Sequence, residues 1–277
     1  MSKRKIIIIL VSFVFSLGAF LFWLFKPSFL DKAKKNTQSN NTSPEPILIS
    51  TLTLAQRPYL LLEPKSSVEP KSLGHWVTVN IIDPKEFERV EYEFEYTTAT
   101  IIQGGMGRLD FRREPAPIKK EIAFGSASKG KYKYDEGVNK GHFIFHFFKE
   151  DKEAVLKTDF ILETRMMNGG IFRTADGKGR LEVDKTDLAE NDYLLIASTL
   201  GLPQMPQNQV LAGPYSFYAD SPKKLKESKV IFNDIKEKEV LVLFWNGQKW
   251  EELETRIINE EAVAIPKALG VFVLVAQ

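Results

Sequence analysis

The sequence predicts an all-β fold behind an N-terminal transmembrane helix and a flexible stalk. Three observations predict it. Segment 6–25 has no charged residue, segment 34–46 has no apolar residue, and many short stretches further along alternate apolar and polar residues. These patterns are typical of a membrane span, an unfolded linker and half-buried β-strands, respectively. We expect the β-rich region to form two tandem β-sandwiches.

The composition is that of a protein that folds around a core. Of the 277 residues, 43% are hydrophobic, 12% aromatic and 27% charged, which distinguishes the chain from disordered proteins. The formal net charge is only +2 and the two signs are interspersed, so we expect no nucleic-acid partner. The chain has no cysteine, which excludes disulfides, thiolate metal sites, thiol nucleophiles and a lipoprotein anchor.

An apolar segment near the N-terminus is predicted to cross a membrane once. It follows a basic tail, 1–5, begins at Ile6 and ends at Phe25. At about 1.5 Å per residue, a helix of this length spans roughly 30 Å of hydrocarbon. A cleaved signal peptide is the alternative, but cleavage within the segment would leave an apolar run on the new N-terminus. We therefore predict a retained signal-anchor.

The orientation of this span is not decided by the positive-inside rule, because basic residues flank it on both sides. A short basic tail before the helix is typical of signal-anchors, and long C-terminal domains are translocated largely regardless of flanking charge. We therefore expect the head to be extracytoplasmic, on the cell surface. Residues 26–47 form the predicted stalk. The expected partners are the membrane, through 6–25, and proteins or glycans of the cell envelope.

Alternation with a period of two is clearest in 90–96, where aromatic residues and valine alternate with glutamates. Similar stretches are 75–82, 141–148, 155–162, 179–183, 193–199, 230–232, 240–245, 262–265 and 271–276. Clusters of Gly, Pro, Asn and Asp separate them. No longer segment has a convincing helical period. Many short strands at this spacing predict a β-sandwich.

The sequence at 168–170, Asn-Gly-Gly, is the predicted boundary between two sandwiches. It divides the head into a first sandwich, 48–168, and a second, 169–277. A single larger sandwich with the same strands is the alternative.

The dipeptide Asn246-Gly247 predicts a two-residue type I′ hairpin, because both residue types tolerate positive φ. The hairpin places Trp245 and Trp250 on adjoining strands.

The C-terminal part resembles the closing strands of bacterial surface β-sandwich domains. Those domains have a W-[DN]-G-x-x-W hairpin and a final F-x-[LV] strand. The matching positions are Trp245, Asn246, Gly247, Trp250, Phe272 and Leu274. Residues 92–162 resemble an Ig-like or cohesin-like sandwich of membrane-anchored bacterial ectodomains. The resemblance implies a fold and a surface location, and it contains no catalytic motif.

Three short motifs have ordinary explanations. Ser126-x-x-Lys129 has the spelling of the nucleophile motif of penicillin-recognising enzymes, but it lacks the partner motifs and we interpret it as a turn. His142 and His146 would lie about 13 Å apart on a strand, too far to share a metal. Residues 104–107, Gly-Gly-Met-Gly, lack the context of a phosphate loop and predict a turn between strands.

Four aspartates are the candidate calcium ligands, because Ca²⁺ takes carboxylates from loops. They are Asp176, Asp184, Asp187 and Asp192. Their spacing matches no EF-hand, and solvated turns are the simpler explanation.

Three tryptophans are candidate ligand-binding residues. Trp76, Trp245 and Trp250 could form an aromatic platform that stacks a sugar, although sandwich cores use tryptophan in the same way.

No catalytic motif and no cofactor site stands out. We therefore expect a non-enzymatic, membrane-anchored surface protein with a structural, adhesive or complex-forming role. A glycan-binding module is the alternative. A third hypothesis is an anchored hydrolase, whose carboxylate pair would be hidden among 36 acidic residues.

Overall fold

Most of the described chain forms β-strands. The computed structural model describes residues 46–47, 52–65, 73–220, 224–237 and 239–277. The first elements are β1 (Pro46–Ile47), β2 (Tyr59–Pro64), β3 (Trp76–Asp83), β4 (Arg89–Thr97), β5 (Ile102–Asp110), β6 (Ile118–Ala123), β7 (Gly125–Ser128), β8 (Lys131–Tyr134), β9 (Lys140–Lys149) and β10 (Lys152–Thr164). They are followed by α2 (Arg165–Asn168), β11 (Ile171–Arg173), β12 (Gly179–Glu182), β13 (Tyr193–Ser198), β14 (Val210–Ala219), β15 (Lys229–Phe232), β16 (Val240–Trp245), β17 (Trp250–Leu253), β18 (Thr255–Ile258), β19 (Glu261–Ala264) and β20 (Gly270–Ala276). The predicted all-β fold is confirmed.

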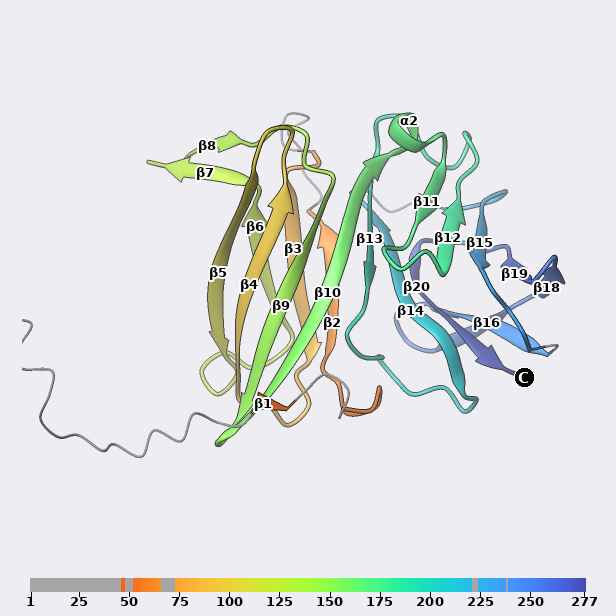
Figure 1. Ribbon diagram of the computed structural model, residues 1–277, viewed down its shortest axis with the longest axis horizontal. Coiled ribbons are helices and arrows are strands. Elements are labelled where there is room, and N and C mark those ends of the chain that lie inside the picture. The colour runs from red at the N-terminus through yellow and green to blue at the C-terminus, as the bar shows by residue number, and fades with distance from the viewer. Residues whose placement is uncertain (1–45, 48–51, 66–72, 221–223, 238) are drawn as a thin grey trace, which may run out of the picture. The chain divides into compact units, whose positions relative to one another are not determined.

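Within the described residues the strands form a ten-stranded sheet, here the large sheet, and three smaller sheets (Figure 1). The large sheet has the order β17-β16-β20-β14-β13-β10-β9-β4-β5, and β1 pairs with β10 outside this path. Its pairs are antiparallel, apart from the parallel pair of β1 and β10. The smaller sheets are the five-stranded sheet β11-β12-β15-β19-β18, the three-stranded sheet β2-β3-β6 and the β7-β8 hairpin.

Every stretch that alternation predicts overlaps an observed strand. The turn predicted at 104–107 is wrong, because these residues lie inside β5 and pair in register with β4. Gly105 and Gly107 leave room for aromatic rings of the neighbouring strand β4. A Cβ on Gly107 would lie 2.3 Å from the hydroxyl oxygen of Tyr92, and one on Gly105 would lie 2.8 Å from the ring of Phe94.

The first hydrophobic core lies between the three-stranded sheet and the large sheet. Apolar side chains on the facing sides of both sheets bury each other. The three-stranded sheet contributes Leu60, Leu62, Val77, Val79, Ile81 and Ile122. The large sheet contributes Val90, Tyr92, Phe143, Phe145, Phe147, Phe160, Leu162 and Leu195.

The second core lies between the five-stranded sheet and the opposite end of the large sheet. Side chains of the five-stranded sheet include Phe172, Leu181, Val230, Phe232, Ala262 and Ala264. Those of the large sheet include Ile196, Phe217, Val242, Phe244, Phe272 and Leu274. The two cores thus occupy different parts of one continuous sheet.

Strand β13 contributes to both cores. Leu195 and Ala197 point into the first core, whereas Leu194 and Ile196 point into the second. Successive side chains of a strand lie on opposite faces, so the three-stranded and five-stranded sheets cover opposite faces of the large sheet. This arrangement explains why the apolar run in β13 is unbroken rather than alternating.

The predicted boundary at 168–170 falls directly after strand β10. Gly169 ends the short helix α2 in the left-handed conformation, with φ 69°. The three-stranded sheet precedes this point and the five-stranded sheet follows it, while the large sheet continues across it through the pairing of β10 with β13. The division into 48–168 and 169–277 stays a prediction.

The predicted membrane span, 6–25, lies outside the described residues, as does most of the predicted stalk. Among the helices of the described part, none has the length and hydrophobicity of a membrane span. The anchor and the stalk therefore stay predictions.

Candidate functional site

The four candidate calcium ligands take part in hydrogen bonds within the chain. Asp184 Oδ1 accepts the backbone N–H and the hydroxyl of Thr186, both at 2.8 Å. Asp192 Oδ2 accepts the N–H of Ala189 at 3.2 Å. In the part of the chain that the structure describes, no group of three or more His, Cys, Asp or Glu side chains is placed to hold a metal ion.

Asp176 connects the turn between β11 and β12 to the large sheet. Its Oδ2 accepts a hydrogen bond from the hydroxyl of Tyr215 at 2.6 Å. Its Oδ1 accepts one from the Thr174 hydroxyl at 2.7 Å and one from the N–H of Lys178 at 3.0 Å. Burial acts to raise the pKa of Asp176, but these hydrogen bonds outweigh it and the pKa lies below its ordinary value.

Asp187 anchors the loop that precedes β15. Its Oδ2 accepts the backbone N–H groups of Lys226, Glu227 and Ser228 at 2.9, 3.1 and 3.1 Å, and the Ser228 hydroxyl at 2.7 Å. Burial acts to raise the pKa of Asp187, yet the hydrogen bonds to its charged form lower it overall. The side chain therefore has a structural role.

The histidines of β9 each face a different carboxylate. His142 Nε2 lies 3.9 Å from Glu95 Oε2, and His146 Nδ1 lies 2.5 Å from Glu153 Oε1. Their predicted position on a strand is confirmed.

The Ser126-x-x-Lys129 motif lies in the β7-β8 hairpin: residues 126–128 belong to strand β7 and only Lys129 lies in the turn, so the interpretation as a turn holds for Lys129 alone. Ser128 pairs with Lys131, and the residues between them, Lys129 and Gly130, have φ of 50° and 75°. This is the positive φ that a tight hairpin turn requires.

Trp76 lies apart from the other two candidate tryptophans. It is buried, its Nε1 donates a hydrogen bond to the Tyr134 hydroxyl at 3.2 Å, and the ring of Tyr132 meets it edge-on at 4.9 Å. Lys65 Nζ lies 4.2 Å from the centre of the Trp76 ring. Trp76 therefore holds the β7-β8 hairpin against β3 and offers little open ring surface.

Trp245 and Trp250 lie on adjoining strands, as predicted, with ring centres 5.3 Å apart. The two-residue type I′ turn is wrong. The loop comprises 246–249, and of its residues only Gly247 has positive φ, at 96°. Asn246 instead stabilises the loop through its side chain, whose Oδ1 accepts the N–H groups of residues 248 and 249, both at 2.9 Å.

Trp245 also lines a pocket of about 610 Å³, here the Trp245 pocket. One wall is the outer face of β2 and β3, and the other is formed by the ends of β14, β16 and β20. Its lining residues are Tyr59, Leu61, Glu63, Asn80, Ile82, Asp83, Pro203, Tyr218, Phe244, Trp245, Asn246, Gly247, Ala268, Leu269 and Gly270. Its volume is in the range of small-molecule sites.

The polar groups of the Trp245 pocket come mainly from the three-stranded sheet. Asn80 Nδ2 donates a hydrogen bond to Glu63 Oε2 at 3.2 Å. Asn80 is only 7% exposed, and its Oδ1 has no hydrogen-bond partner among the described residues. Burial raises the pKa of both Tyr59 and Tyr218, and the charge of Glu63 adds to each shift. Both phenols are therefore neutral hydroxyl groups at physiological pH.

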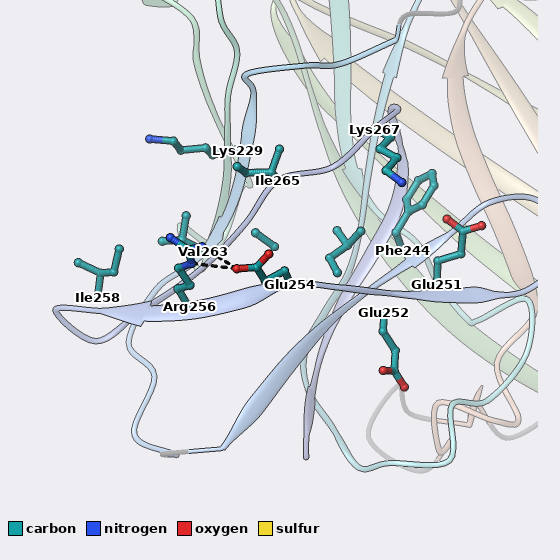
Figure 2. Close-up of a pocket in the computed structure, with 12 residues that line it drawn as sticks. Lys229, Phe244, Glu251, Glu252, Glu254, Arg256, Ile258, Val263, Ile265 and Lys267 are labelled. Carbon is teal, nitrogen blue, oxygen red and sulfur yellow. Dashed lines mark hydrogen bonds and ion pairs between the residues drawn. The ribbon is translucent and has the colours of Figure 1, made fainter.

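A second pocket, of about 510 Å³, lies beside β17, β18 and β19 (Figure 2). Arg256 and Glu254 form an ion pair at 2.6 Å on one side of it, and Figure 2 shows Lys267 beside the ring of Phe244 on the other. Both signs of charge line this pocket, and Glu252 points away from the other labelled side chains. Such a mixed, open rim offers no preference for one kind of ion.

Strand β5 forms one edge of the large sheet (Figure 1). Among the described strands it pairs only with β4. The strand is nine residues long, and its first six residues, 102–107, carry no charge. Ile102 is 69% exposed and Met106 is 82% exposed. A long edge strand with an uncharged segment presents unpaired N–H and C=O groups that can pair with a strand of another chain.

No protein-family model matches the chain, and a comparison with the curated proteins finds no match either.

Sequence reasoning missed the residues that complete the Trp245 pocket. Tyr59 and Glu63 lie on β2, which has an unbroken apolar run and no alternation to reveal it. Asn80 was within a predicted strand, but its role depends on pairing with β2. The available signal was an asparagine inside the mostly apolar stretch 76–82.

Proposed function

We propose that the chain is a membrane-anchored, extracytoplasmic protein without enzymatic activity, whose head has an adhesive or complex-forming role. The uncharged span 6–25 supports the anchor, and its basic tail supports the orientation. The resemblance to Ig-like or cohesin-like ectodomains supports a surface location. Two tandem sandwiches, 48–168 and 169–277, are part of this proposal, supported by the two hydrophobic cores.

The observation that carries the complex-forming role is the position of β5 at the edge of the large sheet, where among the described strands it pairs only with β4. Natural sheets usually protect an edge with charges, proline, bulges or a short strand. The first six residues of β5 have none of these features, and they pair with β4 in unbroken register. The strand therefore suits the addition of a further β-strand.

The strand that we propose as the partner is β5 of a second copy. An isologous pair satisfies the free edges of both molecules at once. Two uncharged segments can meet without like-charge repulsion, and a membrane tether confines the copies to one surface, which raises their effective concentration.

Cysteine cross-linking tests this role cleanly, because the chain has no cysteine. Membranes that contain the full-length Met106→Cys variant would be treated with a short bismaleimide. We expect a product of twice the chain's 31.6 kDa. The control is Met166→Cys, on α2, where the native side chain is also exposed. A product of another mass would identify a different partner that carries a thiol of its own, and no product beyond that of the control would contradict the pairing of two β5 strands.

Glycan binding is a second candidate function. Trp245 supports it, because the tryptophan lines a pocket together with Glu63 and Asn80.

A further inference from the structure

The Trp245 pocket combines two partly exposed aromatic rings with a polar pair on the opposite wall. Trp245 and Tyr218 are partly exposed and come from β16 and β14. Flat rings of this kind offer apolar area to the C–H face of a ligand ring at low entropy cost. The polar pair, Glu63 and Asn80, comes from β2 and β3.

Glu63 and Asn80 present a carboxylate and a carboxamide side by side. Their Oε2 and Nδ2 atoms are 3.2 Å apart, and this contact fixes the orientation of the amide. Asn80 Oδ1 is then an acceptor without a donor among the described residues, although the residue is more than nine-tenths buried. A buried acceptor without a donor is costly. Because Asn80 Oδ1 is enclosed by protein atoms, a ligand hydroxyl group would donate to the Glu63 carboxylate instead, which Asn80 Nδ2 holds in place.

The charges of the Trp245 pocket disfavour an anionic ligand. No lysine or arginine is among its lining residues. The negative charge of Asp83 is balanced by Lys85, which does not line the pocket. Asp83 accepts hydrogen bonds from the Lys85 backbone N–H at 2.8 Å and from Lys85 Nζ at 2.6 Å. Glu63 makes no such ion pair among the described residues. The pocket therefore suits a neutral ligand that is rich in hydroxyl groups.

We propose that the Trp245 pocket binds a neutral polyhydroxylated ring, that is, one uncharged sugar unit of a glycan. Trp245 and Tyr218 stack against its apolar face, while Glu63, held in place by Asn80 Nδ2, accepts a hydrogen bond from one of its hydroxyl groups. The site is independent of strand addition, because none of its lining residues belongs to β5. It rests on the second candidate function, glycan binding, and gives it a ligand class and a site.

Saturation-transfer NMR on the full-length chain in phospholipid nanodiscs tests this proposal. Nanodiscs are needed because glycoside detergents would compete for the site. The probes are glucose, galactose and N-acetylglucosamine, and tetramethylammonium serves as a cationic probe. We expect at least one of the sugars to bind in the millimolar range and tetramethylammonium not to displace it. Binding of the cation alone, or of no probe, would overturn the proposal.

Two variants and two controls locate the site. Glu63→Gln keeps the shape of the pocket and should weaken sugar binding about tenfold, because it replaces a charged acceptor. Trp245→Ala should abolish sugar binding. If Trp245→Ala does not fold, the test rests on Glu63→Gln.

Glu252→Gln and Trp76→Phe change the same residue types outside the pocket and should bind like wild type. Unchanged binding by Glu63→Gln would show that the sugar binds elsewhere. These outcomes are separate from Met106→Cys cross-linking, so either proposal can fail alone.

Discussion

Leu195 and Ile196 are neighbours in β13, and their side chains lie in different hydrophobic cores. The strand also pairs with β10 on one side and with β14 on the other. Disrupting β13 therefore removes packing and hydrogen bonds from both halves of the large sheet. This relationship couples two regions that the sequence divides at 168–170.

Substitution of either residue with alanine should destabilise the whole head. Leu195→Ala and Ile196→Ala should each lower the free energy of unfolding by about 2–5 kcal/mol, because each leaves a cavity in a packed core. We expect one cooperative urea transition for fragment 46–277, with coincident curves from far-UV circular dichroism and tryptophan fluorescence. Two separate transitions, each shifted by only one of the substitutions, would contradict this coupling.

Removal of the Asp187 carboxylate should make the head less stable at neutral pH. Asp187→Asn weakens the acceptor for the N–H groups of residues 226–228 and for the Ser228 hydroxyl. We expect a loss of about 2–3 kcal/mol in the free energy of unfolding at pH 7. The measurement is the urea midpoint, with Glu252→Gln as the control for a change of exposed charge.

The free energy of unfolding of Asp187→Asn should also depend less on pH than that of wild type. The folded pKa of Asp187 is below its unfolded value, so its contribution is fully present above the ordinary aspartate pKa of about 3.9 and is lost as the pH falls through the folded value. The stability difference between wild type and Asp187→Asn should therefore shrink below about pH 4. A difference that stays constant down to pH 2 would show that the charge of Asp187 does not matter.

Gly247→Val should strain the loop between Trp245 and Trp250. Gly247 has φ 96°, and an added Cβ would meet no atom within 4 Å. The cost therefore comes from the backbone alone and should be about 1–3 kcal/mol. The urea midpoint of fragment 46–277 measures it, and Gln248→Val is the matched control because its φ is not positive. Equal urea midpoints for Gly247→Val and Gln248→Val would contradict the expected backbone strain at position 247.

Gly107→Ala should destabilise the first core from its edge. The added Cβ would lie 2.4 Å from the ring of Tyr92, which is buried against the first core. We expect a loss of about 1–3 kcal/mol, as for other overpacked sites. Met106→Ala, in the same strand, is the control without a clash. A wild-type midpoint for Gly107→Ala would mean that the Tyr92 ring moves freely.

The sequence predicts strands that alternate, such as β4, and also the long apolar runs of β13, β16 and β20, but it misses β2 and β5. In 90–96 one face is apolar and the other is acidic, so the pattern is visible. Strand β5 lacks that pattern, because Gly105 and Gly107 occupy the positions next to aromatic rings. Strand β2 lacks it for the opposite reason: Leu60 and Leu62 face the first core while Tyr59 and Leu61 pack on the other side, so the run is apolar throughout.

The candidate site is only partly visible in the sequence for a related reason. The pairing of Trp245 with Trp250 is local and follows from a short loop. The meeting of Trp245 with Glu63 and Asn80 depends on how the outer face of β2 and β3 packs beside β14, β16 and β20. Such long-range packing leaves no periodic signal. The orphan acceptor of Asn80 likewise becomes apparent only once its neighbours are placed.

Protease treatment of intact cells tests the central claim, a membrane-anchored head outside the cytoplasm, most directly. The cells would express the full-length chain with a C-terminal epitope tag, and a cytoplasmic protein would serve as the control for leakage. We predict that the chain is recovered in the membrane fraction, and that external protease removes the epitope while the cytoplasmic control stays intact. An epitope that is protected until the cells are lysed, or a chain that is recovered outside the membrane fraction, would contradict the account.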